Sequence, residues 1–336
     1  MDFPLDQAAK PDSPCLAFAK LCRLPNLFTA WADIFAGYFV VSMYAEGNLG
    51  FQTPLVFVGL VLASSLIYSA GMILNDYHDR EIDAQQRPDR PIPSGAISPR
   101  TALVSALGML AVGCVLAFLA GYVYVGHVAI PWRGGVIALI LSAAVIAYDV
   151  ILKRTLLAPW MMGVCRFFNI LLGMSLAAKL PPTEVWQVCG YDAGQLMFAG
   201  GIGLYIVGVT WFARTEAVES DRWMLGLGGG LMVGGIGLLA ALVAVQPSVV
   251  SINQSFGAFG LWGVLVLLSL VLARRAVLAI ARPEPQNVQL TIKQAILSLI
   301  FYDAAITLAV AGHLGAIAIV ALLVPMLGLR RWMYST

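Results

Sequence analysis

Charged residues are scarce in this chain, and so is any excess of one sign. Asp, Glu, Lys and Arg make up 11% of the 336 residues, against about 25% in an ordinary soluble domain. Hydrophobic residues make up 60% and the mean hydropathy is +0.85, which together exclude a soluble globular enzyme. The 20 basic side chains nearly balance the 18 acidic ones, so the formal net charge is only +2. Without a basic field, nucleic acid is excluded as a partner.

A recognisable cysteine pattern and a targeting signal are also lacking. The five cysteines stand at spacings that match neither a zinc site nor a paired disulfide framework, so we expect free thiols. The first 23 residues are polar, acidic and proline-containing, without the continuous apolar run of a secretory signal. We therefore expect no cleavable signal.

Long apolar runs dominate the rest of the chain. A helix needs about 20 apolar residues to cross the hydrocarbon core, where backbone groups find no water. Ten such runs cover approximately residues 25–44, 54–74, 101–123, 134–152, 157–178, 194–213, 223–245, 255–273, 293–311 and 314–329. The sequence predicts an all-α polytopic membrane bundle of nine to ten transmembrane helices, the last run, with Pro325, deciding between the two. We expect a cytoplasmic segment 1–23, a transmembrane domain 24–312, and an additional membrane segment and tail 313–336.

Lys and Arg gather on one side of this layout. If the N-terminus is cytoplasmic, that side holds all of them except Arg133 and Lys179, on the opposite side, and Arg166, within a span. This asymmetry is the one that the positive-inside rule describes. We expect a multi-pass protein of a cytoplasmic membrane, of bacterial type, with the functional mouth on the cytoplasmic side.

The run at 223–245 is rich in glycine. Gly230 and Gly234 stand in GxxxG spacing, which predicts a close contact with a neighbouring helix. We assign this run to packing and not to chemistry.

The densest acidic cluster follows the second run, in the stretch NDYHDREID. At about 100° per residue, Asp76, Asp79 and Asp83 share one face of a helix that continues out of the membrane. We therefore expect their carboxylates to converge on one point. Such carboxylates repel one another unless a divalent cation binds, and oxygen ligands with room for water suit Mg²⁺, which substrate phosphates usually share. The alternative is a solvated loop, which would explain the nearby arginines but not three acidic residues on one face of a helix.

Basic side chains accompany these acids. In the loop RPDRPIPSG, prolines stiffen the backbone that presents Arg87 and Arg90, and guanidinium groups match phosphate oxygens. Lys153 and Arg154 lie on the same side after the fourth run, where Lys153 is our preferred further phosphate ligand and a topology anchor is the alternative. Carboxylates for a metal and cations for phosphate, together at a membrane surface, indicate a diphosphate ligand with an apolar remainder.

A second acidic cluster, ARTEAVESDR, follows the sixth run and faces the same side. Glu216 and Glu219 lie one helical turn apart, which suits a second cation. A solvated helix end is the alternative for Glu219.

Polar groups within the runs are costly, so each is a functional candidate. Arg166 is expected either to reach a phosphate or to pair with Asp33 or Asp303. A structural ion pair is the alternative for both aspartates.

These motifs resemble the UbiA superfamily of intramembrane prenyltransferases, which includes 4-hydroxybenzoate polyprenyltransferase and chlorophyll synthase. The superfamily's first signature, NDxxDxxxD followed by RPxRPxxSG, corresponds to Asn75, Asp76, Asp79 and Asp83 and then to the loop from Arg87 to Gly95. The resemblance covers residues from about 20 to 312. It extends to further positions: Asn26, the stretch Lys153, Arg154 and Thr155, and Arg166, Asn169 and Gly173.

The second signature departs from the superfamily. It normally reads YDxxYAxxDxxDD, whereas this chain reads VGVTWFARTEAVES and places Glu216 and Glu219 where aspartates are expected. The stretch TWFARTEA resembles a bacterial subgroup called EboC-like. Glutamate keeps an oxygen ligand but extends it by one methylene, so a bound cation would shift.

The resemblance implies a Mg²⁺-dependent prenyl transfer. Asp76, Asp79 and Asp83 would hold one Mg²⁺ on a prenyl diphosphate, and Glu216 with Glu219 a second. Arg90 and Lys153 would stabilise the departing diphosphate, and a hydrophobic acceptor, expected to be aromatic, would attack the allylic cation inside the lipid-facing bundle. The resemblance also places Asn26, Asn75, Arg87, Arg154, Arg166 and Asn169 at the substrate. The alternative is a non-catalytic isoprenoid-diphosphate or lipid carrier with the same pocket, which the altered second signature leaves open.

Overall fold

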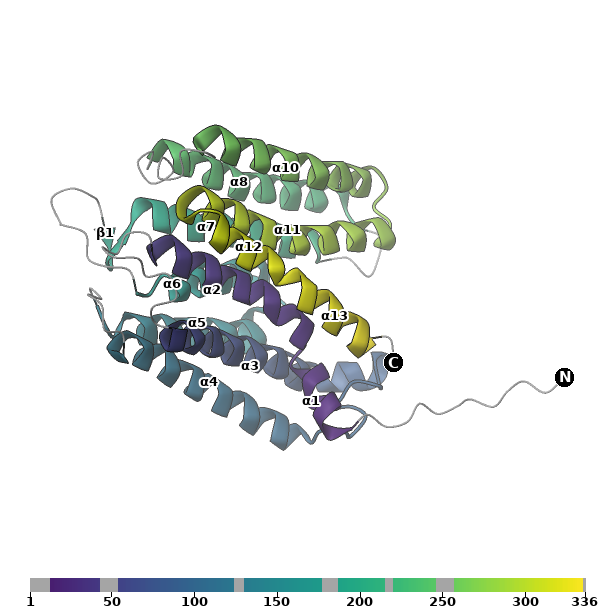
Figure 1. Cartoon of the computed structure of the whole chain (residues 1–336). Helices are drawn as coiled ribbons and strands as arrows, with labels where there is room; N and C mark the ends of the chain where they lie inside the picture. The colour runs from purple at the N-terminus through teal and green to yellow at the C-terminus, as the bar shows by residue number, and fades with distance from the viewer. Residues whose placement is uncertain are drawn as a thin grey trace.

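The computed structural model describes residues 13–42, 54–123, 130–176, 187–214, 220–245 and 257–334. These ranges are almost wholly helical (Figure 1). The first half contains α1 (Pro14–Leu21), η1 (Leu24–Asn26), α2 (Leu27–Ser42), α3 (Pro54–Gln86), α4 (Pro99–Val123), α5 (Arg133–Ala147), the π-helix η2 (Tyr148–Leu152) and α6 (Ala158–Gly173). The second half contains β1 (Gln187–Val188), β2 (Tyr191–Asp192), α7 (Ala193–Phe212), α8 (Arg222–Val245), α10 (Gly257–Ala281), α11 (Pro285–Ala311), α12 (His313–Ala321) and α13 (Leu323–Tyr334).

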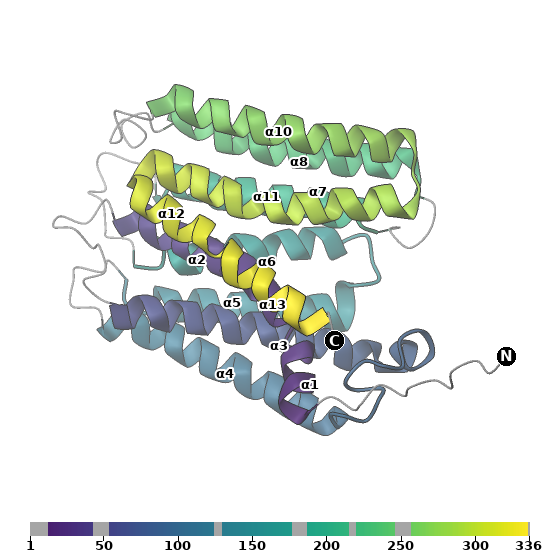
Figure 2. The same ribbon diagram turned by 45° about the vertical axis from the view of Figure 1, so that its right-hand side comes forward.

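The helices stack in layers with their axes roughly aligned. α8 and α10 form one outer layer over α7 and α11, and α3 with α4 and α5 lie on the opposite side of the bundle (Figures 1 and 2). α2 and α6 lie between these layers, since α2 packs on α11 and α3 while α6 packs on α7 and α5. The site described below is therefore enclosed by helices from both halves of the chain.

Length and apolarity identify this bundle as a multi-pass membrane protein. Within the described ranges, nine helical segments are long and apolar enough to cross a membrane. α6 is shorter, with 16 residues. Large apolar side chains point outward from α4 and α10, including Val104, Leu107, Phe259 and Leu270, where a bilayer would cover them. The expected all-α polytopic fold is confirmed.

The last predicted span is helical but broken. α12 ends at Ala321 and α13 starts at Leu323, two residues before Pro325. A proline inside a helix has no N–H to donate and its ring clashes with the carbonyl four residues earlier, here that of Ala321, which explains the break. Gly312, with φ of 86°, makes the sharp turn that separates α11 from α12. The segment then runs back along α2 toward η1 (Figure 2).

The close helix contact occurs at other glycines than the GxxxG pair. A Cβ on Gly230 would meet nothing within 4 Å, and one on Gly234 would lie 3.5 Å from a side-chain carbon of Leu204 on α7, which is an ordinary contact, so neither makes a close backbone approach. On α8 it is Gly228 that touches Gly208 of α7, and Gly235 that touches Gly201. Each pair of glycines on one helix is seven residues apart, which is two turns, so both members lie on one stripe, whereas Gly230 points elsewhere.

We expect that Gly208→Leu will destabilise the bundle. A Cβ there would lie 2.5 Å from the backbone nitrogen of Met232 and 2.6 Å from the carbonyl oxygen of Gly228, so α7 and α8 would have to separate. Overpacking of this kind costs about 1–3 kcal/mol or more. The apparent melting temperature in detergent measures the loss, and Gly229→Leu is the matched control because its Cβ meets open space. Equal melting temperatures for the two variants would contradict this packing.

Arg133, one of the two basic residues that we predict on the opposite side from the other Lys and Arg residues, has a structural role. Arg133 donates to the carbonyl oxygen of Ser175 at 2.8 and 3.0 Å and to that of Gly190 at 3.1 Å. Its guanidinium also lies 4.5 Å from the ring centroid of Tyr191. Arg133 thus ties the start of α5 to the hairpin that precedes α7, which accounts for a cation where the positive-inside rule disfavours one.

Candidate active site

The acidic motif lies on the last turns of α3. The helix runs without a break from Pro54 to Gln86, so it carries the motif beyond the apolar run, as expected. Asp76 and Asp83 are buried, and Asp79 is partly exposed. All three side chains lie on one side of the helix and each contacts a basic side chain. The three basic side chains, Arg23, Arg90 and Lys153, come from different parts of the chain.

A tight loop brings Arg90 back to the helix that precedes it. The backbone N–H of Ser94 donates to Arg90 O at 2.9 Å, and Gly95, with φ of 78°, closes the next turn. The buried side chain of Ile92 anchors the loop in the core. As a result, Arg90 Nη1 donates to Asp76 Oδ1 at 3.0 Å and to Asp83 Oδ2 at 2.7 Å.

Arg23 supplies a second guanidinium from the N-terminal side. It stands just before η1 in the left-handed conformation, with φ of 49°, and its Nη2 donates to Asp76 Oδ1 at 2.8 Å. Its neighbour Cys22 is buried, and burial raises the pKa of that thiol to about 11. From the sequence, Arg23 counted only as one of the basic residues that predict the membrane orientation. Its position three residues before Asn26 was the available signal.

Lys153 supplies the third cation. Its ammonium group forms an ion pair with Asp79 Oδ2. Lys153 follows η2, where one turn of π-helix replaces the α-helix, a feature that is frequent at functional sites. The expected nearness of Lys153 to the acidic motif is therefore present.

The geometry corrects one expectation about these acids. Within the described residues, no three acidic, His or Cys side chains gather closely enough to hold a metal ion by themselves. Asp76 and Asp83 both accept a hydrogen bond from Arg90 Nη1, at 3.0 and 2.7 Å, whereas Asp79 pairs with Lys153. Two of the three carboxylates therefore meet at one point, and the expected convergence of all three is wrong.

The donor chemistry still fits a divalent cation shared with a ligand. Asp76, Asp79 and Asp83 each use one carboxylate oxygen for a basic side chain, and the other has no hydrogen-bond partner in the described part of the chain. Hard oxygen donors of this kind suit Mg²⁺ completed by water and phosphate oxygens. The residues present thus fit Mg²⁺ on a diphosphate better than Mg²⁺ alone.

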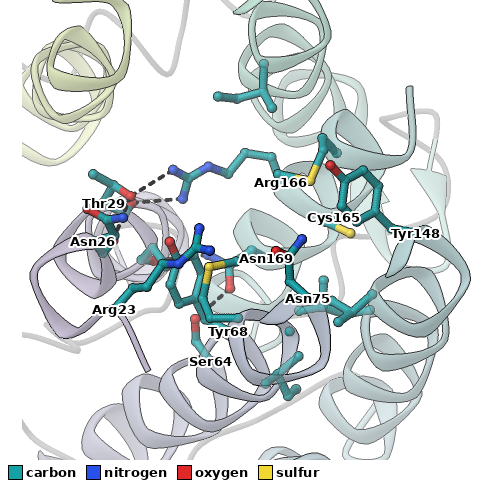
Figure 3. Close-up of a pocket in the computed structure, with 18 of the residues that line it drawn as sticks. Arg23, Asn26, Thr29, Ser64, Tyr68, Asn75, Tyr148, Cys165, Arg166 and Asn169 are labelled. Atoms are coloured by element: carbon teal, nitrogen blue, oxygen red, sulfur yellow. Dashed lines mark hydrogen bonds between the residues drawn. The ribbon is translucent and has the colours of Figure 1, made fainter. Parts of the chain in front are cut away.

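A cavity of about 330 Å³ opens beside this charged cluster (Figure 3). Its polar lining comes from η1 and α2, α3, η2 and α6, and includes Arg23, Asn26, Thr29, Ser64, Tyr68, Asn75, Tyr148, Asp149, Arg166 and Asn169. The remaining wall is mainly apolar, with Leu141, Val145, Met162, Ile206, Val209 and Leu299 among its residues. The cavity therefore joins charges at one end to an apolar interior.

The intramembrane polar residues form one network at the cavity wall. Arg166 Nη1 donates to Asp33 Oδ2 at 2.7 Å, which confirms one of the expected pairings, and Asn169 Nδ2 donates to the same oxygen at 2.8 Å. Arg166 also donates to the backbone carbonyl oxygen and to the hydroxyl oxygen of Thr29, each at 3.0 Å (Figure 3). Asp303 on α11 lies near Asp33 and Arg166 and interacts electrostatically with both. The network joins α2, α6 and α11.

Four of the seven predicted substrate residues line this cavity, and three do not. Asn26, Asn75, Arg166 and Asn169 line it, whereas the exposed Arg87 and Arg154 and the partly exposed Arg90 lie outside its lining. Glu216 and Glu219 fall outside the described residues, so their roles stay predictions. The sequence analysis missed Asp149, which lines the cavity and accepts a hydrogen bond from Asn75 Nδ2 at 3.2 Å. Its place next to Tyr148, shortly before Lys153, was the signal.

A comparison with protein families decides which group this fold and site belong to. The profile of the UbiA prenyltransferase family matches residues 34–273. The chain belongs to the UbiA prenyltransferase family. The matched segment contains the acidic motif, the Arg90 loop, Lys153, Arg166 and Asn169.

Curated relatives of this UbiA family member include archaeal enzymes. It is 39% identical over 138 residues to the digeranylgeranylglyceryl phosphate synthase of Metallosphaera sedula, covering 41% of this chain and 43% of the relative. It is 38% identical over 134 residues to the synthase of Natronomonas pharaonis, covering 40% and 42%. The chain thus matches less than half the length of these relatives.

Solved structures share the fold of this UbiA protein. A digeranylgeranylglyceryl phosphate synthase superposes with a TM-score of 0.63 at 17% identity, covering 90% of this chain and all of that one. A UbiA homologue from Archaeoglobus fulgidus, bound to DMAPP and Mg²⁺, superposes with a TM-score of 0.53 at 12% identity over 86% of this chain and 98% of that one. At these identities the likeness supports the bundle architecture.

Proposed function

We propose that this chain is a Mg²⁺-dependent intramembrane prenyltransferase, which moves a prenyl group from an isoprenoid diphosphate to a hydrophobic acceptor. One observation carries the proposal. Asp76, Asp79, Asp83, Arg90 and Lys153 form a cluster of paired carboxylates and cations, and Arg23, which also pairs with Asp76, lines a largely apolar cavity inside a multi-pass bundle. Charge for a diphosphate and a dry space for its tail are what this reaction requires.

The charged cluster is suited to diphosphate departure. The free carboxylate oxygens of Asp76, Asp79 and Asp83 would hold Mg²⁺, which neutralises charge on the leaving group when bound. Arg90 and Lys153 already lie beside these oxygens, so they would contact diphosphate oxygens without a large movement. Asn75 and Asn26 would orient the substrate, and Arg87 and Arg154 would attract it from solvent. Glu216 and Glu219 would hold a second Mg²⁺.

The cavity interior is suited to the rest of the reaction. Its apolar wall would exclude water from the allylic cation and shelter the tail. Arg166 and Asn169 would contact the acceptor, which we propose is aromatic. The relatives named above are synthases of a glycerol phosphate lipid, so a glycerophosphate acceptor is the competing possibility.

The charge asymmetry supports an orientation for this membrane protein. Arg23, Arg90, Lys153 and Arg154 all lie at the end of the bundle where α3 ends, and we propose that this end faces the cytoplasm. The proposed division into segments 1–23, 24–312 and 313–336 places the catalytic part in the middle. A bacterial origin gains no support from the archaeal relatives.

Metal-dependent diphosphate release tests the proposal directly. Purified chain in detergent should release diphosphate from geranyl or geranylgeranyl diphosphate with Mg²⁺ and lose this activity when EDTA removes the metal. Release should resume when Mg²⁺ is added back, and a mixture of phenolic acceptors should yield prenylated product. Tight Mg²⁺-dependent binding of the diphosphates with neither release nor product would instead show a carrier with the same pocket.

A further inference from the structure

We infer that Asp149 is the general base of this site, and that it takes the proton of an acceptor hydroxyl group as the prenyl group is transferred. This inference rests on the proposed function, because it names a residue and an acceptor chemistry for that same reaction. Prenylation of a hydroxyl releases one proton, and the residues discussed so far bind diphosphate, metal or the cavity wall. None of those residues is assigned to accept that proton.

The position of Asp149 meets the geometric requirement for a base. The residue is buried, belongs to η2 and lines the cavity next to Tyr148 (Figure 3 shows Tyr148 and Asn75 facing the same space). Its Oδ1 accepts the hydrogen bond from Asn75 Nδ2 at 3.2 Å. Its Oδ2 has no hydrogen-bond donor among the described residues, although the carboxyl group borders a cavity large enough for a substrate. A base must first be within reach of the proton that it removes.

The surroundings place this base where bond formation would occur. Lys153, four residues later, pairs with Asp79, so Asp149 lies between the proposed diphosphate site and the apolar wall that begins with Val145. The charged or titratable groups that act on Asp149 electrostatically are Lys153, His78 and Asp79. An acceptor that fills the cavity would have its hydroxyl near Asp149 when its apolar part faces Val145.

The transfer step balances with this assignment. The bond between prenyl carbon C1 and the diphosphate oxygen breaks, and its electron pair leaves with the diphosphate. A lone pair on the acceptor oxygen forms the new bond to C1, and the hydroxyl proton passes to Asp149 Oδ2. No oxidant or further reactant is needed. The acceptor class that follows is a weakly acidic hydroxyl compound, such as a phenol.

The substitution Asp149→Asn separates the basicity of this side chain from its role in positioning Asn75. Asparagine has nearly the same shape, and its own carbonyl oxygen accepts the Asn75 hydrogen bond, but its amide does not take up a proton. The experiment compares the native chain, Asp149→Asn and the control Glu284→Gln, an exposed carboxylate just before α11. Two rates are measured with Mg²⁺ and geranylgeranyl diphosphate: diphosphate release without acceptor, and prenylation of a series of phenols of increasing acidity.

We expect Asp149→Asn to slow prenylation of weakly acidic phenols by about 100-fold or more, the scale of general base catalysis. The defect should shrink toward none for phenols that are already ionised, and added formate should restore part of the rate. Diphosphate release without acceptor and the thermal melting curve should stay native. Glu284→Gln should behave like the native chain with every phenol.

Three results would overturn the inference. An equal defect for all phenols, or an unchanged rate, would show that Asp149 only positions Asn75 or supports the fold. Diphosphate release by the native chain without alkylation of any phenol would refute the acceptor class while leaving the proposed function intact. Absence of both release and product in the native chain would refute the proposed function and this inference with it.

Discussion

Asp76→Asn should lower Mg²⁺-dependent diphosphate release by about 100- to 1000-fold, the effect of removing one preorganised electrostatic contact in an active site. Asp76 Oδ1 receives hydrogen bonds from both Arg23, at 2.8 Å, and Arg90, at 3.0 Å, and the side chain is only 7% exposed. The amide keeps the shape of the carboxylate but removes its negative charge. The variant therefore loses the metal ligand that we propose and leaves two guanidinium groups facing each other without the carboxylate between them.

A substitution on the same helix provides the control. Glu81 lies five residues after Asp76, its side chain is 85% exposed, and its ion pair is with Arg80 outside the site. Glu81→Gln removes one negative charge from α3 and should leave the rate unchanged, since an exposed pair contributes little. The measurement is the initial rate of diphosphate release, with the melting curve of each variant as the test of folding. Native activity in a folded Asp76→Asn protein would remove the acidic motif from the mechanism.

Asp33→Asn should destabilise the bundle by about 3 kcal/mol or more, the cost of breaking a buried charge pair by removing one partner. Asp33 is fully buried and accepts hydrogen bonds from Arg166 at 2.7 Å and Asn169 at 2.8 Å on the same oxygen. Without the carboxylate, the guanidinium of Arg166 keeps its contacts to Thr29 but loses its nearest negative charge inside an apolar bundle. The free energy of unfolding in mixed detergent micelles measures the change.

Asp303→Asn is the matched control for that measurement. Asp303 is as deeply buried as Asp33, but both of its oxygens have no hydrogen-bond donor in the described residues. Asparagine keeps the shape of the Asp303 side chain, and the pair between Asp33 and Arg166 stays in place. We expect an unchanged or higher stability for Asp303→Asn. The reverse order of the two variants would show that Asp303 is the counter-ion of Arg166.

The site illustrates what a local pattern predicts and what it does not. Asp76, Asp79 and Asp83 were predictable because helical periodicity places residues three and seven apart on one face. That periodicity predicts a shared face but not a shared partner, because Asp76 and Asp83 meet at Arg90 whereas Asp79 pairs with Lys153. The contact of Arg90 with both carboxylates was suggested by nearness in sequence. Arg23 and Asp149 were missed because their partners, Asp76 and Asn75, lie 53 and 74 residues away.

Packing inside the bundle shows the same limit. GxxxG spacing pointed to Gly230 and Gly234, yet Gly228 and Gly235 make the close backbone contact with α7. A glycine-rich helix offers several stripes of small residues, and spacing alone does not say which one faces a neighbour. The matching glycines, Gly201 and Gly208, lie on α7, so only the packed pair of helices selects the stripe.

The amino-acid sequence by itself determined the class of this protein and the parts of its chemistry that lie close together along the chain. Apolar runs of membrane-spanning length require helices, and the acidic motif with its arginine loop indicates a diphosphate, because these properties depend on composition and local spacing. Only the tertiary structure decided that Arg23 and Lys153 pair with that motif, that Arg166 pairs with Asp33 and that Asp149 borders the cavity. Those contacts join helices whose relative placement depends on side-chain packing over the whole bundle, which no local spacing encodes.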